Sequence, residues 1–253
     1  MAEMNETSGK AANEVRVFDD VASLVRATAE EIVAIAREAV DARGRFAWAL
    51  AGGSTPRDVY RLLASEPYRE RMPWNAIHCF WGDERHVPPD HPDSNFRMAR
   101  EALLDAVPLP AGNIHRVPAE EPDAQRAAAE YESALREFFQ GEAWPVFDLI
   151  QLGLGKEGHT ASLFPGGTAL HERERWVVAP WVEAQSTFRV TFTPPVLNHA
   201  RRAMFLVAGE EKAAALHAVL EGARDPDLYP AQIVEGNRLW MVDRAAARLL
   251  RVS

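Results

Sequence analysis

A histidine and a carboxylate lie close together in the segment GLGKEGHT (153–160), where Glu157 precedes His159 by two residues. An imidazole has an unperturbed pKa of about 6.5, so it can accept a proton near neutral pH. A neighbouring carboxylate can hold the ring and stabilise the imidazolium that forms. The structural alternative is a histidine that caps a short helix beside a solvated glutamate. The pair is therefore a candidate general base with its orienting group.

The same segment formally satisfies the pattern G-x-G-x-x-G, which raises a dinucleotide-binding interpretation. That fingerprint requires a long helix that starts within it and an acidic residue about 20 residues later. Pro165 stops any helix here after roughly two turns. The following strand candidate, WVVAP (176–180), ends in alanine and proline instead of an acid. The dinucleotide interpretation therefore fails in its context.

A glycine turn in the segment GGSTP (52–56) could bind a phosphate monoester. Two glycines after a buried strand let the backbone approach a ligand, and a following helix offers free N–H groups to an anion. Ser54 or Thr55 is the expected N-cap, with Pro56 at the first helical position. The alternative is a tight turn with a capping residue and no ligand. No Gly-Lys-Ser/Thr follows, so a nucleoside triphosphate is not expected.

Charged residues follow a second buried strand in GDERHVPP (82–89). Such a run is usually a solvated loop, but at the end of a central strand Arg85 could also meet a phosphate or carboxylate. Asp83 or Glu84 could serve to fix that arginine. Arg189, at the start of a later strand, and Lys212, at the start of a later helix, are further cations that either face the same cleft or are simply exposed.

Hydrophobic periodicity predicts the elements that position these loops. Short apolar runs predict strands, and apolar residues at helical spacing predict helices between them. This alternation predicts an α/β fold, three-layered, with a mostly parallel sheet flanked by helices. Ligands of such sheets lie beyond the carboxyl ends of the strands, where the three loops fall. The expected strands are 14–18, 46–51, 77–81, 146–155, 176–180, 188–195, 204–209 and 238–243, and the expected helices are 20–42, 54–64, one from about 94, 122–139 and 210–220.

Composition narrows the classes of function. The 253 residues carry 28 basic and 37 acidic side chains, a net charge of −9, so no nucleic-acid partner is expected. Cys79 is the single cysteine, and no histidine has a second ligand at metal spacing, so neither a disulfide nor a metal is expected. No secretory signal or apolar run of about 18 residues is found, which predicts a cytoplasmic protein without a membrane partner. Residues 1–13 are expected to form a disordered tail, and 14–253 a single domain.

Taken together, four blocks of the sequence resemble the 6-phosphogluconolactonases. GDERHVP and GHTASLFPG are the most diagnostic pieces, because related sugar-phosphate isomerases and deaminases share the glycine turn but replace these two. The resemblance runs from about residue 15 to the C-terminus. It implies a sugar-phosphate isomerase/deaminase-like fold, no cofactor, a phosphorylated sugar lactone as the substrate, and an activity in the oxidative pentose phosphate pathway; a monomer is favoured. The blocks are LAGGSTPRDVY (50–60), FWGDERHVPPDHPDSNFRMA (80–99), LGLGKEGHTASLFPGG (152–167) and VTFTPPVLNHARRAMFLVAGEEK (190–212).

The resemblance also implies roles for individual residues. His159 would be the base that activates water for attack on 6-phospho-D-glucono-1,5-lactone. Glu157 stands where the family usually has aspartate. The carboxylate that would orient the imidazole is therefore the point at which this chain departs from the family pattern. Asp83 would be a positioning residue, and Asn95 falls in a family block without an assigned role. The residues implied around the substrate, near its phosphate, are Gly53, Ser54, Thr55, Arg85, Arg189 and Lys212.

Two other functions compete with this one. A sugar-phosphate isomerase or aminosugar-phosphate deaminase on the same fold would use Asp83 or Glu157 to move a proton next to a carbonyl. A sensor that binds sugar phosphates without turnover would regulate a partner, although no helix-turn-helix segment or additional domain is evident. Assays with the alternative substrates discriminate between the enzymes, and ligand-dependent stabilisation without turnover would identify the sensor.

Overall fold

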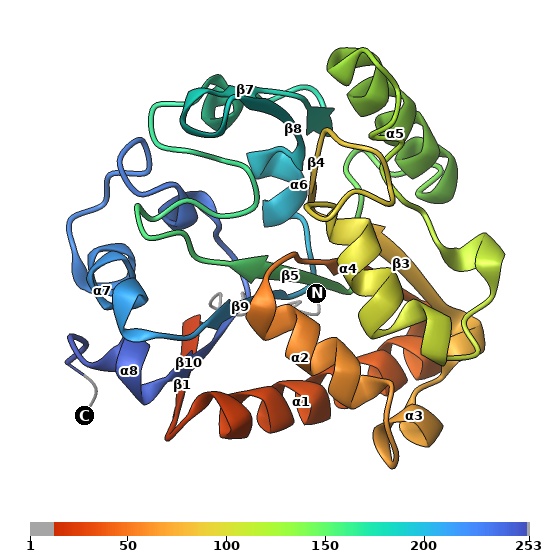
Figure 1. Cartoon of the computed structure of the whole chain (residues 1–253), viewed down its shortest axis with the longest axis horizontal. Coiled ribbons are helices and arrows are strands. Elements are labelled where there is room, and N and C mark those ends of the chain that lie inside the picture. Colours follow the sequence, from red (N-terminus) through yellow and green to blue (C-terminus); the bar gives the residue numbers. More distant parts are fainter. Residues whose placement is uncertain (1–12, 252–253) are drawn as a thin grey trace, which may run out of the picture.

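A parallel sheet of six strands forms the centre of the molecule (Figure 1). The computed structural model describes residues 13–251. Every neighbouring pair in the sheet is parallel, as the near-continuous apolar runs predicted. In spatial order the strands are β1 (Asn13–Phe18), β10 (Arg238–Asp243), β9 (Ala203–Val207), β5 (Leu149–Gly153), β2 (Phe46–Leu50) and β3 (Ile77–Trp81).

The direction of the connections changes between β5 and β2. From β2 the chain passes through helical segments to β3 at one edge of the sheet, whereas the next strand of this sheet after β5 is β9, on the other side of β5. A crevice opens beyond the carboxyl ends of parallel strands at such a switch point. The loops that follow β2 and β5 therefore flank the expected position of a ligand.

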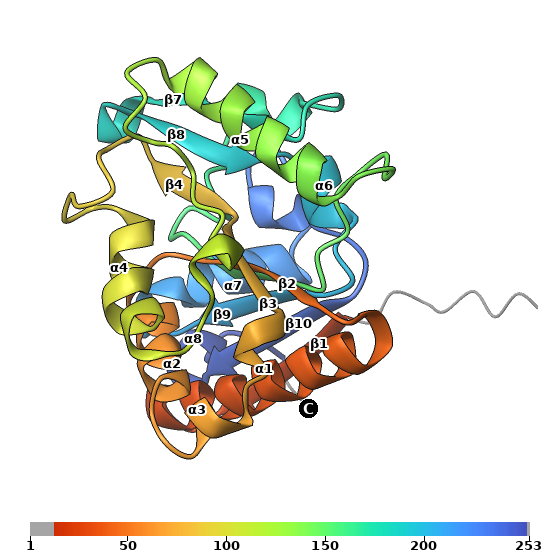
Figure 2. The same ribbon diagram turned by 90° about the vertical axis from the view of Figure 1, so that its right-hand side faces the viewer.

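One face of the sheet is covered by α1 (Val21–Arg43) and α2 (Ser54–Leu63), which pack against each other (Figure 2). The long first helix follows the predicted range. Asp20 caps it by accepting a hydrogen bond from the Ser23 N–H at 2.7 Å, and Gly44 ends it with φ 72°. The smaller helices α3 (Tyr68–Arg71) and α4 (Asn95–Ala102) both contact α2. Helix α4 begins directly after Ser94, near which its start was predicted.

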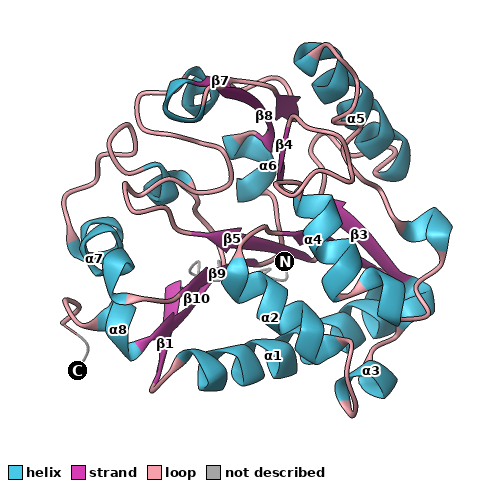
Figure 3. Cartoon of the chain, viewed as in Figure 1, coloured by secondary structure: helices cyan, strands magenta, loops and turns pink. Residues whose placement is uncertain are grey.

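The other side carries a second, antiparallel sheet that the sequence pattern did not reveal (Figure 3). It consists of β4 (Asp83–Arg85), β8 (Thr187–Phe192) and β6 (Val177–Val178), with β7 (Trp181–Val182) paired to β8. The interpretation of the charged run after β3 as a solvated loop is therefore wrong for 83–85. Three polar residues give no alternation of apolar and polar side chains long enough to identify a strand.

Helix α5 (Ala124–Phe138) packs on β6 and β8 of the small sheet. Its apolar face follows the predicted spacing, and Asp123 caps it. The remaining helices are α6 (Pro194–Asn198), α7 (Ala213–Glu221) and α8 (Arg244–Ala247). Single turns of 3₁₀ helix occur at Trp74–Ala76, Leu104–Ala106, Ala111–Asn113, Thr168–His171, Glu183–Gln185, Glu210–Lys212 and Pro230–Ile233.

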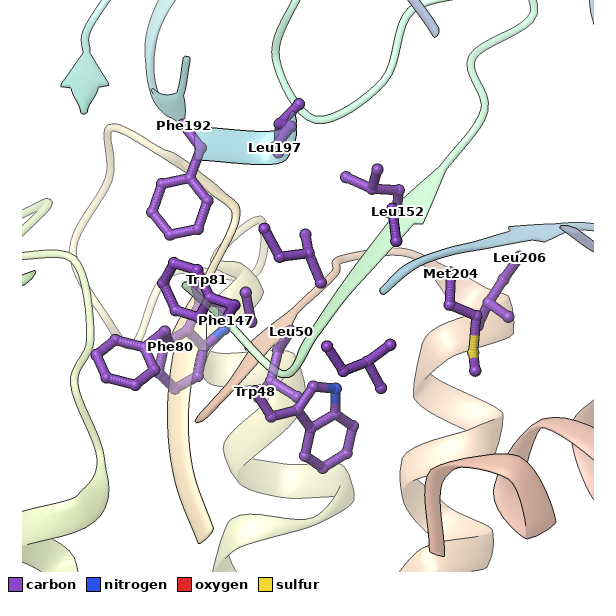
Figure 4. Packing of buried hydrophobic residues seen from close by; sticks show 14 of the residues in the cluster. Trp48, Leu50, Phe80, Trp81, Phe147, Leu152, Phe192, Leu197, Met204 and Leu206 are labelled. Carbon is purple, nitrogen blue, oxygen red and sulfur yellow. The ribbon is translucent and has the colours of Figure 1, made fainter. Parts of the chain in front are cut away.

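Aromatic side chains join the two sheets (Figure 4). Phe147 lies between Phe80 of β3 and Phe192 of β8, with ring centroids 5.3 and 5.2 Å away, respectively. All three rings are fully buried. Burying an aromatic side chain of this size stabilises the fold by about 1.5–3 kcal/mol. This packing fixes the small sheet over the strand ends of the large one, and so fixes the residues that β4 and β8 carry.

The predicted tail lies outside the described residues except for Asn13, which pairs with Arg238 at the edge of the large sheet. Between Asn13 and Arg251, no helix combines the length and apolar character needed to cross a membrane.

Candidate active site

A cavity of about 290 Å³ lies beyond the ends of β2, β3 and β5. The small sheet contributes residues from its side through β4 and β8. Six of the residues predicted for the site line this cavity, namely Gly53, Asp83, Arg85, His159, Arg189 and Lys212. Three others do not line it: Ser54, Thr55 and Glu157. The fold thus brings together residues that are up to 159 positions apart along the chain.

The glycine turn after β2 differs from the prediction at the start of its helix. Helix α2 begins at Ser54, two residues before Pro56, the predicted first helical position, and Gly53 is its N-cap at φ 103°. This backbone conformation favours glycine, and it places Ser54 and Thr55 in the first turn instead of at the cap. Their N–H groups are at the free end of a ten-residue helix, beside Gly53 in the cavity wall. The hydroxyl groups themselves do not line the cavity.

Gly52 has no room for a side chain, because the Asn95 side chain lies against its α-carbon. A Cβ atom at Gly52 would lie 1.9 Å from Asn95 Oδ1. The Asn95 Nδ2 donates a hydrogen bond to the Asp83 carbonyl oxygen at 2.9 Å. Asn95, which the sequence placed in a family block without a role, therefore connects the glycine turn to β4 and lines the cavity.

Glu84 anchors the start of α4. Its buried carboxylate accepts hydrogen bonds from the N–H groups of Asn95 and Phe96, each at 2.7 Å, and from the Arg85 N–H at 2.8 Å. Burial raises the pKa of Glu84, while these three hydrogen bonds oppose the shift. The alternative that Glu84 fixes the Arg85 guanidinium is wrong, since the carboxylate binds backbone N–H groups. It positions Asn95 and the arginine backbone.

Asp83 joins three parts of the site. Its Oδ2 accepts a hydrogen bond from Ser162 Oγ at 2.7 Å and lies 3.9 Å from Arg189 Nη1. Ser162 follows His159 by three residues and is buried. The Asp83 carboxylate thus contacts both the loop that carries His159 and strand β8. Sequence reasoning missed Ser162, whose only signal was its place in the GHTASLFPG block.

His159 lies in the cavity wall with its ring tilted against Phe164, at a centroid distance of 4.2 Å. Gly155 allows this position, because a Cβ there would lie 2.0 Å from His159 Nδ1. Glu157 Oε1 lies 3.1 Å from the same nitrogen, but the angle departs from that of a hydrogen bond. The predicted carboxylate–imidazole contact is therefore present, with the carboxylate outside the cavity, and it is an ion pair only when the ring is protonated.

Burial lowers the pKa of His159, and the charge of Glu157 acts in the opposite direction. A lowered pKa keeps the imidazole neutral near pH 7, which is the form that accepts a proton. Nδ1 is buried beside Glu157 and makes no hydrogen bond within residues 13–251. Nε2 is therefore the ring nitrogen left to meet a ligand in the cavity.

Three cations line the cavity. Arg85 donates to the Asp93 carbonyl oxygen, and Arg189 donates through Nε and Nη2 to Gln185 Oε1. Burial lowers the pKa of Arg189, with Asp83 opposing the shift and Arg85 adding to it. Burial also lowers the pKa of Lys212, with Glu211 and Glu157 opposing the shift and Lys156 adding to it. This concentration of positive charge suits an anionic group.

No cluster of three or more histidine, cysteine, aspartate or glutamate side chains suitable for a metal ion is found in the described part of the chain. Residues available for acid–base chemistry and anion binding surround the cavity. An imidazole, a glycine turn at a helix start and several cations at a switch point indicate an α/β protein whose cavity can take a small anionic ligand.

Comparisons with known proteins narrow this class. Residues 19–242 match the family described as glucosamine-6-phosphate isomerases/6-phosphogluconolactonase, so the chain belongs to this family. The 6-phosphogluconolactonase of Synechocystis sp. is 46% identical over 218 residues, 85% of this chain and 88% of that protein. The one from Nostoc sp. is 42% identical over 243 residues, 94% of this chain and 98% of that protein.

A solved structure gives the same result for the fold. The 6-phosphogluconolactonase of Trypanosoma brucei superposes with a TM-score of 0.84 at 31% identity, covering 95% of this chain and 100% of that chain. The predicted α/β fold with its mostly parallel sheet is therefore confirmed, as is the resemblance to the lactonases drawn from the signature blocks. The chain is an enzyme of the carboxylic ester hydrolase class.

Proposed function

We propose that this enzyme hydrolyses 6-phospho-D-glucono-1,5-lactone to 6-phospho-D-gluconate through water activated by His159. The observation that carries the proposal is the His159 imidazole in the wall of a cavity that three cations also line. The relatives named as 6-phosphogluconolactonases supply the substrate class. The oxidative pentose phosphate pathway, which the family resemblance implied, is proposed as the setting of this reaction.

Glu157 determines which nitrogen of the neutral His159 ring carries the proton. With the carboxylate 3.1 Å from Nδ1, the proton of the neutral ring is favoured on that nitrogen. Nε2 is then the atom that accepts a proton from water. The water oxygen attacks C1 of the lactone, and the carbonyl electrons move to the oxygen to give a tetrahedral oxyanion. A base in this position accelerates the attack by about 10²–10⁴-fold.

Collapse of the oxyanion breaks the bond between C1 and the ring oxygen. The imidazolium returns its proton from Nε2 to that oxygen, which becomes the C5 hydroxyl group, and the new carboxylic acid loses its proton to solvent. Backbone N–H groups of the glycine turns in the cavity wall or a cation stabilise the oxyanion. No covalent nucleophile is required, because a lactone is already an activated ester.

The phosphate is held by Arg85, Arg189 and Lys212, while the glycine turn at the start of α2 offers backbone N–H groups beside them. These contacts are remote from C1, so their role is to orient the lactone toward His159. Asp83 positions the site through Ser162 and Arg189. No metal or organic cofactor takes part in these steps.

The test is the rate of lactone hydrolysis with purified enzyme after subtraction of the spontaneous rate in the same buffer. Acceleration in proportion to enzyme concentration supports the proposal. Glucosamine 6-phosphate and an aldose phosphate, offered under the same conditions, should not be converted. Turnover of either one, with no acceleration of lactone hydrolysis, would favour the deaminase or isomerase alternative.

A further inference from the structure

Two buried amide side chains in the cavity wall each keep one polar atom without a partner. Gln151 is fully buried on β5, and Asn95 is 2% exposed at the start of α4. Both line the cavity. Among the described residues, Gln151 Nε2 and Asn95 Oδ1 have no hydrogen-bond partner. A buried polar atom without a partner costs about 1–3 kcal/mol, so such atoms indicate a group that is bound in use.

The orientation of the Gln151 amide follows from its neighbours. The Trp48 Nε1–H donates to Gln151 Oε1 at 2.9 Å, and the Tyr60 hydroxyl group lies 3.1 Å from the same oxygen. An indole N–H is only a donor, so the oxygen of the amide must face Trp48. The unpartnered atom is therefore the NH₂ group, which can only donate.

The orientation of the Asn95 amide follows from the hydrogen bond of its nitrogen. Its Nδ2 donates to the Asp83 carbonyl oxygen at 2.9 Å, and a carbonyl oxygen can only accept. The oxygen of the Asn95 amide is therefore the unpartnered atom, and it can only accept. It lies against Gly52, where an added Cβ would be 1.9 Å away.

Both side chains are connected to the segment of chain that follows β2. Tyr60, which contacts Gln151, also exchanges hydrogen bonds with the main chain of Ala51 at 3.0 Å, and Gly52 is the next residue. The cavity lining thus includes a fixed donor, Gln151 Nε2, and a fixed acceptor, Asn95 Oδ1. Neither carries a charge, in contrast to the arginines and the lysine that line the same cavity.

We propose that Gln151 and Asn95 recognise a hydroxyl group of the substrate's sugar ring, with Gln151 Nε2 donating to its oxygen. A hydroxyl group both accepts and donates, so it matches this pair of atoms, whereas a phosphate or carboxylate oxygen would face Asn95 Oδ1 without a proton to share. Gln151 is thereby a specificity-determining residue for polyhydroxylated lactones. This inference rests on the proposed lactone substrate.

The experiment compares the full lactone with a series of 6-phosphorylated lactones, each lacking one ring hydroxyl group, for the wild type and Gln151→Leu. The wild type should disfavour one of the deoxy lactones by about tenfold or more in kcat/KM. Gln151→Leu should lose about tenfold with the full lactone and should no longer discriminate against that one analogue. Its discrimination at the other hydroxyl positions should be unchanged.

Tyr60→Phe is the matched control, because it removes a contact to Gln151 Oε1 but leaves Nε2 in place. It should lower the melting temperature without changing the ranking of the lactones. If Gln151→Leu does not fold, Gln151→Glu serves instead, since it retains the acceptor for Trp48. At a pH where its carboxyl group is ionised, that variant should show the same loss of discrimination.

The outcomes separate this inference from the proposed function. Absence of lactone turnover by the wild type would overturn the proposed function. Normal turnover by the wild type, with the same ratios among the lactones for the wild type and the tested Gln151 variant, would overturn the hydroxyl-recognition role alone.

Discussion

Arg85 and Arg189 lie directly opposite each other on the antiparallel strands β4 and β8. Both line the cavity, and Arg189 is 8% exposed. Like charges at directly opposed positions destabilise a sheet. Asp83 offsets part of this repulsion at 3.9 Å from Arg189. An anion between the guanidinium groups would remove the remainder, which is why we assign the phosphate of the substrate to this part of the cavity.

Replacing Arg189 by methionine should therefore affect binding more than chemistry. We expect KM to rise by about tenfold or more while kcat changes far less, because a charge-assisted contact remote from the reacting carbon is lost. Inorganic phosphate should also raise the melting temperature of the wild type more than that of the variant. A fall in kcat at unchanged KM would contradict the phosphate assignment.

The pH dependence of kcat/KM should report the His159 imidazole. Burial lowers its pKa below 6.5. Activity should therefore stay high as the pH is lowered from 8 to 6.5, and it should fall only at lower pH, where the ring becomes protonated. Glu157→Gln removes the charge that raises this pKa, so the acid limb should move to lower pH. Rates between pH 5 and 8, corrected for spontaneous hydrolysis, measure both curves. A midpoint shifted upward in the variant would contradict the assigned role of Glu157.

Gly155 should be essential for the position of the imidazole. In Gly155→Ala the new Cβ would lie 2.0 Å from His159 Nδ1, so the ring must move. A displacement of about 1 Å can cost about 100-fold in rate, and we expect kcat to fall by that amount. Gly112→Ala is the control, because nothing lies within 4 Å of the added Cβ. Full activity of Gly155→Ala, with a normal melting temperature, would show that the ring position is not critical.

Glu84→Gln should destabilise the fold by about 2–3 kcal/mol, because an NH₂ group would replace an oxygen that accepts backbone N–H groups. Glu101→Gln, on the same helix α4, removes only an exposed ion pair with Arg97 and should cost less than about 1 kcal/mol. Urea unfolding measures both. Equal stability of the two variants would refute the anchoring role of Glu84.

Most of the large sheet follows from local patterns. The apolar runs of β2, β3 and β9 and the periodicity of α1 and α5 are strong signals, and the loops after β2 and β5 met at the strand ends as parallel topology requires. The small sheet was not predictable, because β4 is three polar residues whose partner, β8, lies about 100 residues away. Its pairing depends on long-range packing instead of local propensity.

The site was predictable where a side chain's type already implied chemistry. His159, Arg189 and Lys212 reach the cavity as expected. Glu84 was given the wrong partner, the Arg85 guanidinium, and Gln151 was missed, because their roles depend on partners that only the folded chain supplies: the free N–H groups of α4 for one, and the Trp48 indole for the other. A glutamine inside an apolar strand is nevertheless a signal, since a buried amide must find partners.

The central claim is that His159 activates water, and His159→Ala tests it most directly. The measurement is the enzyme-catalysed rate of 6-phospho-D-glucono-1,5-lactone hydrolysis, corrected for the spontaneous rate, together with binding of the product 6-phospho-D-gluconate by calorimetry. We predict that the variant loses about 10²–10⁴-fold in kcat and still binds the product. Turnover by His159→Ala at the wild-type rate would contradict the account.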